Sequence, residues 1–169
     1  LSFGIDKYWR KKLIKSMEII NGQSVLDIAT GTGDVIFEIN KKYNTKSTGL
    51  DISKKMLDIA NMKLKKIQTK NTQIQFIHGD AEKLPLADNS YDHISISFGF
   101  RNLGDYDMAL KEFHRVLKPG GQLSILEFSK SKTKFFNVVF QVYFNKILPK
   151  LASLISRADA YRYLPESVK

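Results

Sequence analysis

The stretch Asp27–Asp34 reads DIATGTGD and runs directly off the β-type segment Ser24–Ala29 (SVLDIA). Glycine has no Cβ and adopts unusual backbone angles at little cost, so Gly31 and Gly33 permit close approach of a ligand to the backbone. The pattern is shorter than the full dinucleotide fingerprint, because Ile36 stands where a third glycine would be needed. The alternative interpretation is that the two glycines only form a tight turn. The stretch therefore predicts a strand–loop–helix unit whose loop is a candidate ligand site.

Further short β-type runs follow this unit and alternate with helical patterns. The second strand is expected to end with Ser47–Asp51. The third, fourth and fifth strands are expected at Ile74–His78, His93–Phe98 and Leu123–Phe128. Strands that alternate with helices favour a parallel sheet. The sequence therefore predicts an α/β fold of the Rossmann-like, doubly wound type, with a mainly parallel sheet and helices on both faces.

The predicted helices have N-caps and apolar stripes. Ser53 and Asp105 have the side chains that commonly cap a helix N-terminus, and the second of these helices is expected to stop at Pro119–Gly121. A further helix is predicted at Phe135–Leu148. The expected apolar stripes, in chain order, are Trp9, Leu13, Ile14, Met17 and Ile20; then Met56, Leu57, Ala60 and Leu64; then Leu110, Phe113 and Leu117.

Acidic residues stand where the second and third strands end. Asp51 lies about 20 residues beyond the glycine loop, where a carboxylate accepts hydrogen bonds from ribose hydroxyls. Its alternative role is to interact with the dipole of the following helix. Asp80 can accept from an exocyclic amine and Ala81 leaves room for a flat base, although a simple turn also favours this pair. With Asp27, whose charge suits a cationic amino acid, these residues predict a nucleoside site without a diphosphate clamp.

These strand ends resemble the class I S-adenosylmethionine-dependent methyltransferases, and the segment after the fourth strand narrows the resemblance. Ser97–Leu103 (SFGFRNL) is similar to the Phe-Gly-x-Arg-Asn signature of the ubiquinone/menaquinone biosynthesis C-methyltransferases. The resemblance covers nearly the whole chain. Further segments that look like this family are Leu50–Leu57, Leu84–Asp92, Leu126–Ser129, Tyr143–Phe144 and Tyr163–Ser167.

The resemblance implies C-methylation of a prenylated quinol ring, such as demethylmenaquinol, with S-adenosylmethionine as cofactor. The menaquinone and ubiquinone pathways both stay open. Thr32 and Ser97 are expected near the cofactor, and Arg101 and Asn102 are expected to act on the acceptor, where a cation can stabilise a quinolate. No metal is implied. The general base is not identified, and His78 and His93 are candidates only by residue type.

Composition sets wider limits on the protein class. The chain has 169 residues, 43% hydrophobic and 26% charged, and it contains no cysteine, so a soluble globular protein without thiolate chemistry is expected. No apolar run approaches the roughly 20 residues of a membrane span, and no signal peptide is visible. We expect one cytoplasmic domain over residues 1–169, truncated at both ends relative to the family.

The net charge of +10 has several explanations. Many lysines are expected to be solvated surface. Because a prenylated quinol lies in the bilayer, peripheral contact with the inner face of the membrane is a further prediction, through the basic N-terminal helix and Phe135–Leu148. Nucleic acid is not an expected partner, since no aromatic-flanked basic cluster is present. A homodimer stays open.

Other functions fit parts of the same sequence. A methyltransferase for another small molecule would share the cofactor residues, and so would a non-catalytic adenosyl-binding subunit. An assay for cofactor turnover with a quinol substrate would distinguish an enzyme from the non-catalytic subunit. A nicotinamide oxidoreductase is disfavoured by the incomplete glycine fingerprint.

Overall fold

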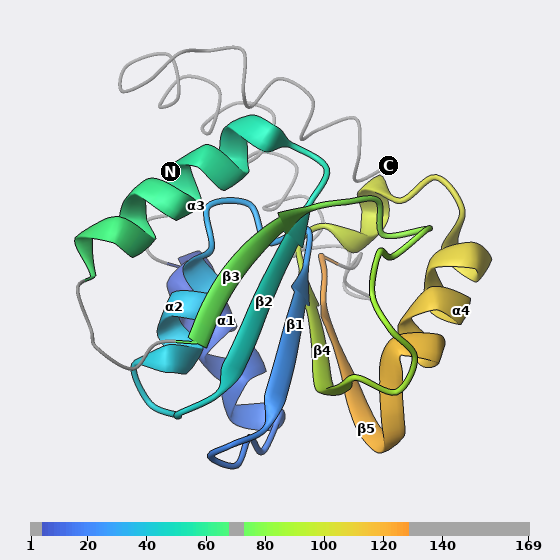
Figure 1. Ribbon diagram of the computed structural model, residues 1–169, viewed down its shortest axis with the longest axis horizontal. Helices are drawn as coiled ribbons and strands as arrows, with labels where there is room; N and C mark the ends of the chain where they lie inside the picture. Colours follow the sequence, from blue (N-terminus) through green and yellow to red (C-terminus); the bar gives the residue numbers. More distant parts are fainter. Residues whose placement is uncertain (1–4, 68–72, 129–169) are drawn as a thin grey trace, which may run out of the picture. The chain divides into compact units, whose positions relative to one another are not determined.

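A computed structural model describes residues 5–67 and 73–128 of the chain (Figure 1). The chain divides into two compact units, of which the larger, Lys7–Leu126, contains the whole sheet. The second unit consists of the two chain ends, Leu1–Asp6 and Glu127–Lys169. The predicted helix at Phe135–Leu148 and the tail after it lie outside the described residues.

The core of the larger unit is a five-stranded parallel sheet with the order β3-β2-β1-β4-β5. The chain moves outward from β1 to β3 and then returns to the other side of β1, so the winding direction reverses between β1 and β4. Ligands of open α/β sheets bind at the carboxyl edge near such a reversal. The strands are β1 (Ser24–Ile28), β2 (Lys46–Asp51), β3 (Gln73–His78), β4 (Tyr91–Ser97) and β5 (Leu117–Leu126).

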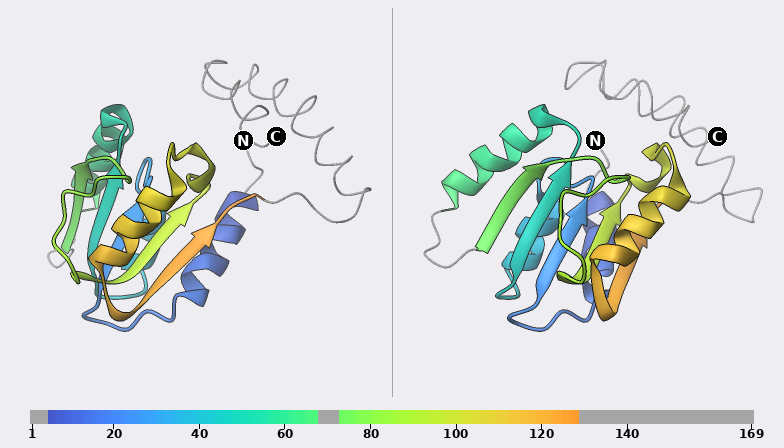
Figure 2. Two further views of the ribbon diagram at one scale, coloured as in Figure 1. Left: turned by 90° about the vertical axis from the view of Figure 1, so that its right-hand side faces the viewer. Right: turned by 45° about the vertical axis from the view of Figure 1, so that its right-hand side comes forward.

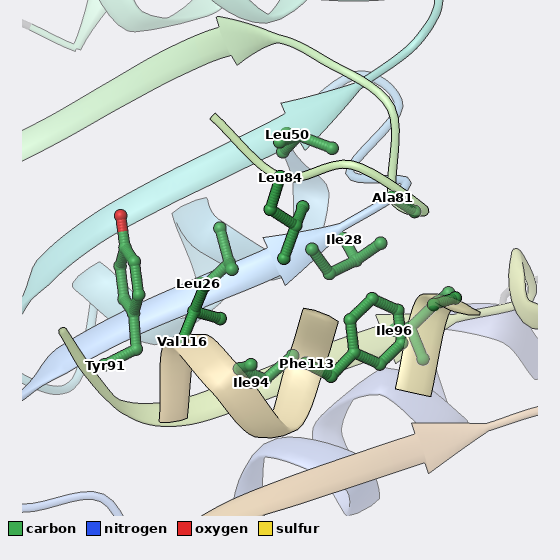
Figure 3. Packing of buried hydrophobic residues seen from close by; sticks show 11 residues of the cluster. Leu26, Ile28, Leu50, Ala81, Leu84, Tyr91, Ile94, Ile96, Phe113 and Val116 are labelled. Atoms are coloured by element: carbon green, nitrogen blue, oxygen red, sulfur yellow. The ribbon is translucent and has the colours of Figure 1, made fainter. Parts of the chain in front are cut away.

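Helices cover both faces of this sheet (Figures 1 and 2). Successive side chains of β1 point to opposite faces, and they belong to two different clusters. Val25 packs with residues of α1 and α2, whereas Leu26 and Ile28 pack with Phe113 of α4 (Figure 3). The predicted Rossmann-like fold is therefore confirmed. The helices are α1 (Ile5–Ser16), α2 (Asp34–Asn40), α3 (Lys54–Lys66) and α4 (Tyr106–Val116), with a short 3-10 helix, η1, at Phe100–Asn102.

Both predicted N-caps are confirmed. The Ser53 hydroxyl accepts a hydrogen bond from the Met56 N–H of α3 at 3.4 Å. The Asp105 carboxylate accepts one from the Met108 N–H of α4 at 2.9 Å. Each cap satisfies a donor that has no partner within the first helical turn, and each places a helix start directly after a loop at the carboxyl edge.

The predicted stripe of α4 is wrong in part. Leu110 is 38% exposed, and the inward face consists of Ala109, Phe113 and Val116. The helix ends at Val116, and Leu117 already belongs to β5. The Pro119–Gly121 segment therefore lies within this strand, at the point where its pairing register with β4 shifts. Positions 109, 113 and 116 lie on one helical face as 110, 113 and 117 do, and the small Ala109 side chain lets the helix approach the sheet.

Two other apolar stripes also extend less far than predicted. Met56 is 43% exposed, at the edge of the α3 face that Leu57 and Ala60 bury. In the first helix, Leu13, Ile14 and Met17 are buried, but Trp9 is 42% exposed and Ile20 is 66% exposed. The helix ends at Ser16, whose hydroxyl bonds to the Leu13 carbonyl. Ile20 therefore lies in the loop before β1 and cannot continue the helical stripe.

Candidate active site at the carboxyl edge

The loop after β1 uses its two predicted glycines for different reasons. Gly31 has a φ of +57°, and no described atom lies within 4 Å of the place where its Cβ would stand. It therefore offers the open backbone that the sequence predicts. Gly33 has a φ of +80°, but its Cβ would lie 2.6 Å from Phe76 Cζ and 2.9 Å from Phe37 Cε2. Two aromatic rings fill the space that a Cβ at Gly33 would need, so packing inside the loop also requires glycine here. The approach of a ligand to the Gly33 backbone stays a prediction.

Asp51, at the end of β2, is the residue that shapes this loop. Its Oδ2 accepts from the Gly31 N–H at 2.7 Å, and its Oδ1 accepts from the Ser53 N–H at 2.8 Å. The Asp51 carbonyl accepts from the Gly79 N–H at 3.1 Å, which joins the ends of β2 and β3. A carboxylate oxygen can accept more than one hydrogen bond, so Asp51 can hold the loop and still accept from a ligand hydroxyl.

Asp27 lies one residue inside the end of β1 and is only 1% exposed. The Ser95 hydroxyl of β4 donates to its Oδ1 at 2.6 Å. Burial raises the pKa of Asp27 to about 6, although the Ser95 hydrogen bond acts in the opposite direction. The structure thus holds a carboxylate between β1 and β4, at the reversal of winding, where its negative charge is poorly solvated.

The loop after β4 carries the segment that resembles the family signature. Phe98 has a φ of +58° and donates its N–H to the Leu126 carbonyl at 2.7 Å. The next residues form η1, in which Arg101 is half-buried and Asn102 is exposed. Because β4 neighbours β1 in the sheet, this loop starts beside the glycine loop. Ser97 is half-buried and is the last residue of β4, directly before this loop.

The whole chain, residues 1–169, matches the sequence profile of the ubiE/COQ5 methyltransferase family. The chain belongs to this family. It is 41% identical, over 99% of its length, to the ubiquinone/menaquinone biosynthesis C-methyltransferase of Geotalea daltonii, of which it spans 72%. It is also 41% identical, over 100% of its length, to the demethylmenaquinone methyltransferase of Thermus thermophilus, of which it spans 76%.

A solved structure agrees with this ubiE/COQ5 family assignment. A SAM-dependent methyltransferase from Aquifex aeolicus has a TM-score of 0.65 and 29% identity, with 74% of this chain and 66% of that chain covered. The predicted family, the enzyme class and the cofactor, S-adenosylmethionine, are therefore confirmed. The expected role in quinone biosynthesis agrees with the names of both relatives.

The glycine loop has the geometry that the predicted cofactor site requires. The open Cβ position of Gly31 and the nearby carboxylate of Asp51 provide a backbone cradle and an acceptor for hydroxyl groups. Asp80 is exposed after β3, and its Oδ1 accepts from the Glu82 N–H at 2.9 Å. Ala81 is buried in the core cluster at 8% exposure. The residues predicted at the first three strand ends thus lie on adjacent strands of one edge.

Lys63 of α3 supports the glycine loop and was not predicted from the sequence. Its ammonium donates to the Thr32 carbonyl at 3.1 Å, the Thr32 hydroxyl at 2.7 Å and Asp34 Oδ1 at 2.7 Å. Asp34 Oδ2 also pairs with Arg10 of α1 at 2.9 Å. A lysine among many on a helix gives no sequence signal that separates it from solvated neighbours. The Thr32 hydroxyl, predicted near the cofactor, is here an acceptor for Lys63.

Glu82 anchors the loop after β4 and was also missed. Its Oε1 accepts from the Gly104 N–H at 2.6 Å and from the Asp105 N–H at 3.0 Å. The Phe100 ring of this loop stacks on the Tyr106 ring at the start of α4, with centroids 5.0 Å apart. The loop that carries Arg101 and Asn102 is thus tied to the segment after β3. A contact between two irregular loops leaves no periodic pattern by which the sequence could reveal it.

The histidines divide by position. His93 is 6% exposed, its Nε2 lies 2.9 Å from Gln23 Oε1, and burial lowers its pKa. It pairs in register with Val25, at the amino half of the sheet, so it is a packing residue outside the site. His78 ends β3 at the carboxyl edge, with Nε2 3.1 Å from the Ile52 carbonyl. His114 is exposed on α4. Only His78 among these three lies at the candidate site.

Proposed function

We propose that this methyltransferase transfers the methyl group of S-adenosylmethionine to a ring carbon of a prenylated quinol. The main supporting observation is the arrangement of two loops at the reversal of winding. The glycine loop with Asp51 lies on one side, and the loop with Arg101 and Asn102 follows the neighbouring strand. The relatives' names point to demethylmenaquinol or a ubiquinol-pathway intermediate as acceptor.

The proposed cofactor site assigns one role to each strand end. Asp51 accepts from the ribose hydroxyls, Asp80 accepts from the adenine amine, and Ala81 borders the base. Gly31 allows close approach, and the buried charge of Asp27 favours the cationic amino-acid part. The remaining members of the proposed site are Thr32, Gly33 and Ser97, with Gly33 acting through the packing of the loop.

The main task of the protein in this reaction is to align the acceptor carbon, the methyl group and the sulfur. The bound cofactor supplies a methyl group on a sulfonium, which is a strong electrophile. The acceptor ring carbon becomes nucleophilic when a neighbouring hydroxyl loses its proton. Arg101 would stabilise the resulting quinolate through its fixed positive charge, and Asn102 would orient the hydroxyl. The hydrogen bonds of Glu82 to this loop matter because they fix the backbone from which the Arg101 and Asn102 side chains extend.

Replacement of Asp51 tests the cofactor site. We expect Asp51→Ala to weaken S-adenosylmethionine binding by about 1.5–3 kcal/mol, as for loss of hydrogen bonds to a charged group. Isothermal titration calorimetry on the folded variant measures this loss. The matched control is Asp58→Ala, because Asp58 is exposed on α3, outside the proposed site. A folded Asp51→Ala protein with unchanged affinity would remove the ribose assignment.

Replacement of Arg101 tests the acceptor site and separates an enzyme from a non-catalytic binding subunit. We expect Arg101→Ala to lower kcat by about 100-fold, the typical cost of removing one group that stabilises an oxyanion. Cofactor affinity should stay near that of the wild type, because Arg101 is assigned to the acceptor. The assignment is wrong if turnover of a demethylquinol persists, or if cofactor affinity falls as much as turnover does.

We further propose that the protein meets this acceptor at a membrane surface. Among the described helices, none is long and apolar enough to cross a bilayer. Tyr8 and Trp9 of α1 are 54% and 42% exposed, and the Lys12 ammonium lies 5.2 and 5.7 Å from their ring centroids. Aromatic rings beside lysines suit an anionic interface. Since Leu13 and Met17 are buried, only the first turns of the predicted N-terminal stripe can serve this role.

A further inference from the structure

The cofactor loop and the acceptor loop meet at Ala29 and Gly99. A Cβ built on Gly99 would lie 2.6 Å from the Cβ of Ala29, a separation that real side chains essentially never show. Gly99 is buried, and its φ of −115° is one that any residue can adopt. The requirement for glycine at position 99 therefore comes from space and not from the backbone angle.

Ala29 is fixed on the cofactor side of this contact. It has a φ of +50°, which is unfavourable for a residue with a Cβ. The preceding residue, Ile28, pairs in register with Leu50 and Ile96, and the following Thr30 donates its N–H to the Leu50 carbonyl at 3.0 Å. Sheet pairing on one side and this hydrogen bond on the other leave Ala29 little freedom to move away.

The acceptor loop is fixed as firmly on the other side. Phe98 is held at a φ of +58° by the bond from its N–H to the Leu126 carbonyl. The Gly99 carbonyl accepts from the Asn102 N–H at 3.1 Å, which closes the turn that carries Arg101. Glu82 holds the end of the same loop through two N–H groups. A displacement of Gly99 would therefore reach Arg101 and Asn102 directly.

We propose that the Ala29–Gly99 contact positions the two loops relative to one another, so that the cofactor and the acceptor are held in one fixed alignment. Both are positioning residues that act through their neighbours. Strained backbone angles persist where the surrounding structure determines them, and here one such angle is at Ala29 itself and the other is at Phe98, next to Gly99. The inference rests on the proposed function in one respect, because it assigns the two loops to cofactor and acceptor.

The test is a compensating pair of substitutions in the whole protein. Gly99→Ala introduces the clash, and we expect about tenfold or greater losses in both cofactor affinity and kcat at saturating cofactor, since small misplacements are costly in catalysis. Adding Ala29→Gly to the same chain removes the opposing Cβ and suits the positive φ, so both constants should recover most of the loss. Calorimetry, turnover and urea unfolding are measured on all four members of the cycle.

Gly121→Ala is the matched control. Its Cβ would meet Leu117 Cδ2 and the Lys118 carbonyl at 2.9 Å, a clash of the same kind, less severe than the 2.6 Å at Gly99 and located at the amino edge of the sheet. We expect it to lower the free energy of unfolding, to leave cofactor affinity and kcat unchanged, and to gain nothing from Ala29→Gly. A general loss of packing would make the two glycine variants behave alike.

Each outcome decides the proposal. Wild-type affinity and kcat in Gly99→Ala would overturn it, as would a double variant no better than the single one. If Gly99→Ala does not fold, restored folding in the double variant supports the contact, and failure to restore it overturns the contact. If the wild type binds no S-adenosylmethionine, the proposed function fails, and the contact is then judged by whether Ala29→Gly restores the unfolding free energy.

Discussion

At the scale of single residues, Asp27 combines a structural cost with a proposed functional charge. Its pKa of about 6 lies above the ordinary 3.8 because the carboxyl is buried. The folded protein therefore binds more protons than the unfolded chain between about pH 4 and 6, so this residue makes the free energy of unfolding fall as pH rises through that window. Above pH 6 the cost is fully present, and it amounts to about 3 kcal/mol by linkage.

Asp27→Asn should remove this cost while keeping an acceptor for Ser95. We expect the free energy of unfolding at pH 8 to rise by about 1–3 kcal/mol, with little difference from the wild type at pH 4. Urea unfolding at both pH values measures this, and the comparison with the wild type cancels the other titrating groups. Cofactor binding should weaken in the same variant. A pH-independent difference between the two proteins would contradict the role of burial.

The residues of the candidate site differ in how far the sequence predicts them. Asp51 could be found because its distance from the glycine loop is a property of the chain order. The packing that requires glycine at position 33 could not be predicted, because it depends on Phe76, which lies two strands away in the sheet. Glu82 likewise acts through contacts between loops. Local patterns thus indicate the residues proposed to bind a ligand, but not the side chains that hold the loops.

At the scale of elements, α3 acts as a brace for the glycine loop. Lys63 uses its three N–H donors on the Thr32 carbonyl, the Thr32 hydroxyl and Asp34. Asp34 in turn starts α2 and pairs with Arg10 of α1. Three helices on one side of the sheet therefore meet at the loop that is proposed to hold the cofactor.

Lys63→Met should loosen this brace. We expect cofactor affinity to fall by about five- to thirtyfold, equivalent to the loss of one to two hydrogen bonds at about 1 kcal/mol each, with kcat at saturating cofactor nearly unchanged. Lys65→Met on the same helix is the control, because Lys65 is exposed. Calorimetry and steady-state kinetics separate the two effects. Equal behaviour of the two lysine variants would show that Lys63 does not position the loop.

The helices also show where sequence patterns reach their limit. The caps at Ser53 and Asp105 depend on local hydrogen bonds, and they were predicted correctly. The inward face of α4 was not, because two faces of similar apolar content share Phe113, and only the sheet surface selects the one with Ala109. Short-range chemistry is readable from one sequence, whereas the choice between competing faces requires the partner surface.

At the scale of the whole molecule, the orientation of α1 gives the membrane proposal its geometry. Gln122 Nε2 donates to the Ser16 carbonyl near the amino edge of the sheet, while Arg10 pairs with Asp34 at the carboxyl edge. The exposed rings of Tyr8 and Trp9 therefore lie toward the edge that carries the candidate site. A bilayer that met these rings would face the loops proposed to receive the quinol.

Vesicle sedimentation tests this orientation. We expect weak binding to anionic vesicles that falls as salt rises, since basic residues contribute on the order of 1 kcal/mol each near an anionic surface and salt screens them. Trp9→Ala with Tyr8→Ala should reduce the binding, and Ile20→Ala, an exposed apolar change in the loop before β1 at the amino edge of the sheet, should not. Equal binding to neutral and anionic vesicles, or no effect of the α1 changes, would contradict the proposal.

The most direct test of the central claim is the product itself. The protein is incubated with S-adenosylmethionine that carries a trideuterated methyl group and with reduced demethylmenaquinone, and the quinol is identified by mass spectrometry with fragmentation. We predict one labelled methyl group on a ring carbon, and loss of that product in Arg101→Ala. An unmodified quinol, or a label on a hydroxyl oxygen, from a folded protein that binds the cofactor would contradict C-methylation at this edge of the sheet.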